Sequence, residues 1–75
     1  MDLSINQIKE KLENDKPEAA LKTEYLLEIS RQYADKAQTD EAAEYAGKAL
    51  EASRSADLTD DFRTNLADTA AEAFA

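Results

Sequence analysis

The sequence predicts an all-α protein, folded as a small antiparallel bundle of about four helices. The 75 residues include one glycine, one proline and no valine, while alanine, leucine, glutamate and lysine are frequent. Those four residue types favour helix, and the absence of valine disfavours strands. Apolar residues also recur at spacings of three and four, separated by short polar breaks. We therefore expect helices at roughly 5–14, 17–37, 40–54 and 59–74, in a single domain that spans residues 1–75.

The first helix begins with a clear capping signal. Ser4 and Gln7 have the spacing of a capping box, in which each side chain accepts a hydrogen bond from the other residue's backbone N–H. Leu3 and Ile8 can form the hydrophobic staple across it. A helix of this length is unstable alone in water, so we expect it to dock on the rest of the chain.

The second helix, expected at 17–37, is the central one. Pro17 suits its first turn, where the missing N–H costs nothing, and Asp15 with Glu18 repeats the capping-box spacing. A second apolar strip, narrower than the main one, includes Leu27 and Ala34, and we expect the first helix to dock there. The main apolar face consists of Leu21, Tyr25, Leu26, Ile29, Tyr33 and Ala37.

The third helix is expected to fold back against the second, because the break between them is short. Thr39 is its predicted N-cap, with Asp40 and Glu41 in the first turn, where negative charge suits the helix dipole. Gly47 in the middle of this helix has two interpretations: close approach of another backbone or of a partner, or a glycine that is tolerated at a cost in stability. The packing face is dominated by small residues, namely Ala42, Ala43, Ala46, Ala49 and Ala52.

The two central helices carry an ordered pattern of large and small residues. A large–large–small–aromatic series precedes spaced alanines: Leu26, Ile29, Ser30 and Tyr33, then Ala42, Ala46 and Ala49. Over residues 23–56 this pattern resembles one tetratricopeptide repeat (TPR), a helix–turn–helix unit of about 34 residues. The resemblance implies that Ser30 lies against Ala42. The sequence departs from the family at Ala37, where a glycine commonly ends the first helix. A weaker resemblance is to microtubule-interacting-and-trafficking domains, which have three helices and a similar central hairpin.

The last helix, expected at 59–74, has Thr59 or Asp57 as its predicted cap. Its apolar stripe starts with Phe62 and Leu66 and ends near Phe74. The TPR resemblance implies that this helix covers the exposed side of the hairpin. Phe74 is interpreted either as a plug of the core or as an exposed hook for another chain.

The sequence offers no set of side chains with catalytic chemistry. It has no histidine and no cysteine, which removes the commonest general bases, thiol nucleophiles and soft metal ligands. The acidic pairs Asp40–Glu41 and Asp60–Asp61 lie at predicted helix starts, where solvated carboxylates are expected. We therefore predict a protein that is not an enzyme and has no cofactor or metal.

The charge balance restricts the partners. Nine basic and 17 acidic residues give a formal net charge of −8. Nucleic acids and anionic membranes would repel such a chain, so the expected partner is another protein with a basic or apolar surface. No apolar run approaches the roughly 20 residues of a membrane span. A cytoplasmic location is expected, and the lack of cysteine fits a reducing compartment.

Binding of another protein is therefore the leading hypothesis. An adaptor or co-chaperone-like module would hold a helix or peptide of a partner protein in an apolar groove. The alternative is a small acidic regulator or inhibitor that blocks a basic, for example nucleic-acid-binding, site on a partner protein. A third hypothesis is self-association as a homodimer through Leu27 or Phe74.

The candidate partner-binding residues come mainly from the second helix. The TPR resemblance implies a concave face on which only Arg31 is basic, so a clamp for a peptide carboxylate is not expected. The candidates are Glu24, Leu27, Arg31, Ala34, Gly47 and Phe74.

Overall fold

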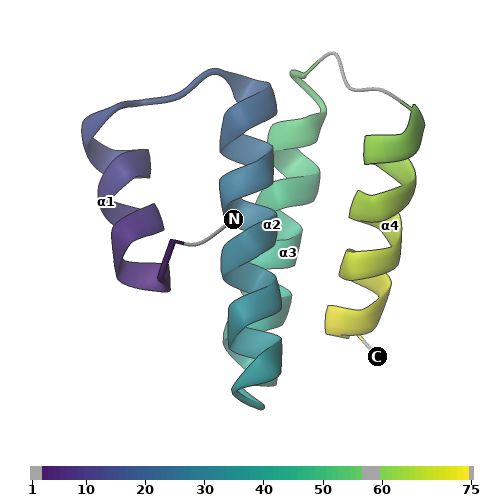
Figure 1. Cartoon of the computed structure of the whole chain (residues 1–75). Helices are drawn as coiled ribbons and strands as arrows, with labels where there is room; N and C mark the ends of the chain where they lie inside the picture. Colours follow the sequence, from purple (N-terminus) through teal and green to yellow (C-terminus); the bar gives the residue numbers. More distant parts are fainter. Residues whose placement is uncertain (1–2, 57–59, 75) are drawn as a thin grey trace.

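The described part of the chain forms a four-helix bundle, as the sequence predicts. The structure is a computed structural model that describes residues 3–56 and 60–74, without the side chains of residues 70 and 72–74. Consecutive helices run antiparallel, and α2 is central, in contact with each of the other three (Figure 1). α1 and α4 flank the α2–α3 hairpin on opposite sides. The four helices are α1 (Ile5–Asn14), α2 (Ala19–Asp35), α3 (Thr39–Ser53) and α4 (Asp60–Phe74).

The predicted capping box of α1 is present. The backbone N–H of Ser4 donates to Gln7 Oε1 at 2.9 Å, and the N–H of Gln7 donates to Ser4 Oγ at 3.3 Å. Leu3 packs against the cluster that contains Ile5 and Ile8, as a hydrophobic staple requires. The helix runs from Ile5 to Asn14, so the predicted bounds of α1 are confirmed.

The starts of α2 and α3 differ from the prediction. Glu18 is the N-cap of α2 and makes no side-chain capping bond, so the predicted box with Asp15 does not form and Pro17 lies before the helix. Gln38 is the N-cap of α3 and Thr39 is already its first residue, so the prediction that Thr39 caps this helix is wrong. The predicted caps of α4, at residues 57 and 59, lie outside the described residues.

The turn between α2 and α3 explains why Thr39 does not act as a cap. The N–H of Gln38 donates to the Tyr33 carbonyl at 2.9 Å, and the N–H of Ala37 donates to the Ala34 carbonyl at 3.0 Å. These are the two bonds of a Schellman motif, which places the residue after the C-cap in the left-handed region. Ala37 accordingly has φ 60. Because the motif ends at Gln38, α3 starts at the next residue.

Small residues bring α2 and α3 together. Ala42, Ala46 and Ala49 are fully buried in the hairpin, and the larger Leu26 packs in the same cluster as Ala49. The fully buried Ser30 donates its Oγ–H to the carbonyl of Ala42 at 2.7 Å. The expected contact between Ser30 and Ala42 is therefore present. It satisfies a hydroxyl that would otherwise be costly to bury.

α1 and α4 cover different sides of α2. Ile5 and Ile8 of α1 are buried against Ile29, whereas Leu27 packs in one cluster with Leu66 of α4. The prediction that α1 docks on Leu27 and Ala34 is therefore wrong, and Ala34 is exposed. Ile29 belongs to a stripe with Tyr25 and Tyr33, spaced by four residues, which offers α1 a larger apolar surface.

Candidate functional site

A groove runs between α2 and α4, and we call it the α2–α4 groove. Its volume is about 380 Å³. The α2 side presents residues at spacings of three and four, so that successive turns face the same way; the α4 side presents residues of its first three turns. The lining residues are Glu24, Leu27, Glu28 and Arg31 of α2, with Phe62, Asn65 and Thr69 of α4.

The floor of this groove is apolar and its rim is polar. Leu27 is 7% exposed and belongs to the main core cluster, against which the partly buried Phe62 packs. At the rim, Arg31 and Glu28 form an ion pair of 3.8 Å between Nη1 and Oε2, with side chains 63% and 19% exposed. Such exposed pairs contribute little stability, so a ligand can displace Arg31 at small cost. Glu24 is exposed on the same rim.

The structure brings three of the six predicted site residues together. Glu24, Leu27 and Arg31 line one groove, as their spacing on a helix requires. Ala34 is exposed further along α2 and does not line the groove. Phe74 ends α4, and its side chain is outside the described residues, so neither interpretation of it is tested.

Gly47 is the remaining predicted site residue, and it lies on α3. A Cβ added there would meet no atom within 4 Å. The interpretation of Gly47 as a point of close backbone approach within the chain is therefore wrong, and close approach by a partner stays a prediction. The other interpretation, a glycine tolerated at a cost in helix stability, agrees with the open space around it.

Four residues of the groove were not predicted as site residues: Glu28, Phe62, Asn65 and Thr69. Three of them come from α4, at intervals of three and four residues from Phe62. Their shared face follows from the helical period. The period alone does not show which helix that face meets, so the pairing of α4 with α2 had to come from the structure.

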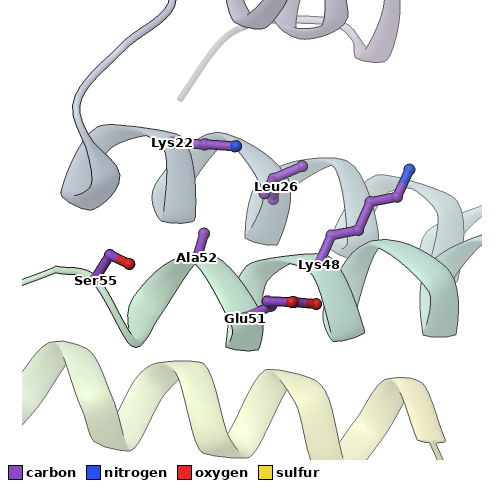
Figure 2. A pocket seen from close by; sticks show the side chains of 6 residues that line it. All are labelled: Lys22, Leu26, Lys48, Glu51, Ala52 and Ser55. Atoms are coloured by element: carbon purple, nitrogen blue, oxygen red, sulfur yellow. The ribbon is translucent and has the colours of Figure 1, made fainter.

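A second groove lies between α2 and α3 and has a different character (Figure 2). Its volume is about 400 Å³. Leu26 and Ala52 supply apolar surface, and the side chains of Lys22 and Lys48 lie on either side of Leu26 in Figure 2. Glu51 and Ser55 complete the lining. Since Lys22 and Leu26 point away from the residues of the α2–α4 groove by the helical period, the two grooves open on opposite sides of α2.

A cluster of lysines and tyrosines joins α1 to the hairpin. Lys9 Nζ donates to Tyr33 Oη at 2.9 Å and lies 5.4 Å from the ring centroids of both Tyr33 and Tyr45. Those two rings stack with centroids 5.7 Å apart. Lys48 Nζ lies 4.6 Å from the centroid of Tyr45. The hydrogen bond to Tyr33 is the main reason why the pKa of Lys9 is raised above its ordinary value of 10.5.

Negative charge is concentrated in the second half of the chain. After Gln38 there are nine acidic and three basic residues, a net charge of −6 out of the total of −8. Lys48 is paired with Glu44 only loosely, at 3.9 Å. The described carboxylates on α3 and α4 are exposed: Asp40, Glu41, Glu44, Glu51, Asp60, Asp61 and Asp68.

Neither metal chemistry nor a known relative identifies the site. Among the described side chains, no group of three or more acidic residues is placed to hold a metal ion. In the same part of the chain, every helix is too short or too polar to cross a membrane. No family model, curated protein or solved structure matches this chain. The interpretation of its function therefore rests on the geometry of the grooves and on the distribution of charge.

Proposed function

We propose that the protein is a non-enzymatic interaction module that holds a segment of a partner protein in the α2–α4 groove. The observation that supports this most is the groove itself, with Leu27 and Phe62 at its floor and polar side chains around them. Two apolar and five polar residues line the groove, and polar groups that converge on an apolar floor can fix the orientation of a ligand. The same place contains three of the residues that the sequence predicts for partner binding.

The volume of the groove limits what it can hold. At about 380 Å³ it lies near the lower end of the range for ligand pockets. It fits one large apolar side chain and the backbone next to it, rather than the full face of a long helix. Asn65 on its wall has an amide that can both donate to and accept from a peptide backbone.

The rim determines the charge of the partner. Glu24 and Glu28 both line the groove, and Arg31 is the single basic residue there. The whole chain has a net charge of −8, so a basic segment is attracted from a distance and an acidic one is repelled. The expected ligand is therefore a segment with one large apolar residue flanked by lysine or arginine.

The test is a selection from a random peptide library displayed on phage, with the intact chain as bait. Enrichment of sequences with an apolar residue between basic residues is expected. Asn65→Arg should then weaken binding of the selected peptide by about tenfold or more, because it fills the groove and adds positive charge. Ser55→Arg adds the same side chain at the α2–α3 groove and is the matched control. Equal effects of the two variants would contradict the assignment to the α2–α4 groove.

A second candidate function rests on the acidic second half of the chain. A net charge of −6 after Gln38, with exposed carboxylates on both α3 and α4, favours a regulator that blocks a basic site on another protein. Under this function, partner binding would fall steeply with salt and would weaken when Asp60 and Asp61 are replaced by asparagine. Asn65→Arg would then weaken binding no more than Ser55→Arg, since each variant adds one positive charge.

A further inference from the structure

The link between α1 and α2 has a backbone conformation that its own residues disfavour. Lys16 has φ 44, in the left-handed region that favours glycine, and it directly precedes Pro17. A residue before proline prefers extended conformations, because the proline ring clashes with its backbone and Cβ in the helical region. Lys16 therefore favours an extended conformation, whereas in the fold-back of α1 onto α2 it is left-handed.

The site that α1 occupies on α2 is specific. Ile8 and Ile29 are fully buried together. Gln32 Nε2 donates to the backbone carbonyl of Leu3 at 2.6 Å, and Lys9 Nζ donates to Tyr33 Oη at 2.9 Å. These contacts fix the position of α1 on the hairpin. They depend on the two surfaces and are the same whichever chain supplies α1.

We propose that α1 is exchanged between two copies of this chain. When Lys16 becomes extended, α1 points away from its own α2, and its site on that helix is left empty. A second copy in the same state fills the site with its own α1, and the exchange is reciprocal. The product is a twofold-symmetric dimer that keeps every α1–α2 contact and removes the backbone strain at both Lys16 residues.

The exchange is compatible with the proposed function but does not depend on it. Helix α4 lies on the other side of the hairpin from α1 (Figure 1), and it supplies one wall of the α2–α4 groove. The α2–α4 groove of each copy therefore remains open, and the dimer has two such grooves. Failure of peptide binding and failure of the exchange are therefore distinguishable outcomes.

The first test compares two glycine substitutions by sedimentation equilibrium over a range of concentrations. The wild-type chain is expected to dimerise after refolding at high concentration. Lys16→Gly removes the strain in the closed form and should weaken dimerisation by at least about tenfold, because two links are relieved per dimer. Ala37→Gly changes the other described non-glycine residue with positive φ, in the α2–α3 turn, and should leave the dimerisation constant within about twofold.

The second test identifies which chain supplies α1. Wild-type chains labelled with ¹³C are refolded together with unlabelled chains, and nuclear Overhauser effects (NOEs) between labelled and unlabelled copies are recorded. A cross-copy NOE between Ile8 and Ile29 is expected in the dimer. The proposal is overturned by a chain that stays monomeric at millimolar concentration, by a dimer without that NOE, or by unchanged dimerisation of Lys16→Gly.

Discussion

At the scale of single residues, two alanine–glycine positions show how the backbone determines which residue is favoured. Ala37 has φ 60 in a Schellman turn, where glycine has no steric cost. Gly47 lies inside α3 with open space around it, where alanine is the better helix former. The glycine and the alanine therefore each occupy the position that suits the other residue.

Ala37→Gly is expected to raise the free energy of unfolding by about 1 kcal/mol, since it removes the left-handed strain of an alanine. Urea unfolding followed by circular dichroism measures this change. The larger conformational freedom of glycine in the unfolded chain reduces the gain. A loss of stability would show that the Ala37 methyl group makes a stabilising contact.

Gly47→Ala is expected to raise the free energy of unfolding by about 0.5–1 kcal/mol. The added methyl group meets nothing within 4 Å, so no overpacking opposes the gain. The control is Ala46→Gly in the same helix, which should lower stability by more than this, because Ala46 is fully buried. A destabilised Gly47→Ala would contradict the observed space around this position.

Lys9→Met is expected to lower the free energy of unfolding by about 1 kcal/mol, through loss of the cation–π contacts and of the bond to Tyr33. The folded state raises the pKa of Lys9, so this contribution is fully present below pH 10.5 and is lost as the pH rises through the higher folded-state value. Urea unfolding at pH 7 and above pH 11 measures the difference in the free energy of unfolding between the wild-type chain and Lys9→Met at each pH. A difference that grows with pH would contradict this account.

At the scale of the helices, nearby residues determine where α1 begins, whereas residues far away in the sequence determine where α1 docks. Its capping box and staple use residues within five positions of one another, which is why the sequence alone could predict that it starts at Ile5. Its docking side depends on a choice between two apolar strips of α2. The sequence pattern contains both strips and does not show which helix covers each of them, so the docking prediction failed.

Ser4→Ala tests the capping of α1. It should lower the free energy of unfolding by about 1 kcal/mol, because the N–H of Gln7 loses its side-chain acceptor. Amide hydrogen exchange should speed up most within α1, since this short helix depends on its cap and on docking. Uniformly faster exchange along the chain would show instead that α1 and the hairpin open as one unit.

In the candidate site, too, the sequence could group residues of one helix but could not show which other helix lies beside them. Glu24, Leu27 and Arg31 share a face of one helix, so their grouping followed from the sequence. Asn65 and Thr69 come from another helix, whose placement depends on how the bundle closes. The TPR resemblance marked Ala37 as the position where a glycine commonly ends this helix, but the alanine there gave no glycine signal, and α2 was predicted to run to residue 37 instead of ending at Asp35.

At the scale of the whole molecule, the protein combines a small core with a large negative charge. The radius of gyration of 11.3 Å agrees with about 11 Å for a compact chain of this length. Such a chain buries only a small core, and its net charge of −8 adds self-repulsion. The same charge attracts basic partners, and the α2–α4 groove provides a place where an apolar side chain can dock.

The measurement that tests this account most directly is a titration of the ¹⁵N-labelled chain with the selected peptide, followed by amide chemical shifts. The account predicts the largest shifts at Leu27, Asn65 and Thr69, and none of that size in Asn65→Arg. Largest shifts at Lys22 and Ser55 would place binding in the α2–α3 groove. Small shifts spread over the acidic residues of α3 and α4 would show diffuse electrostatic association. Either result would contradict the assignment of the α2–α4 groove.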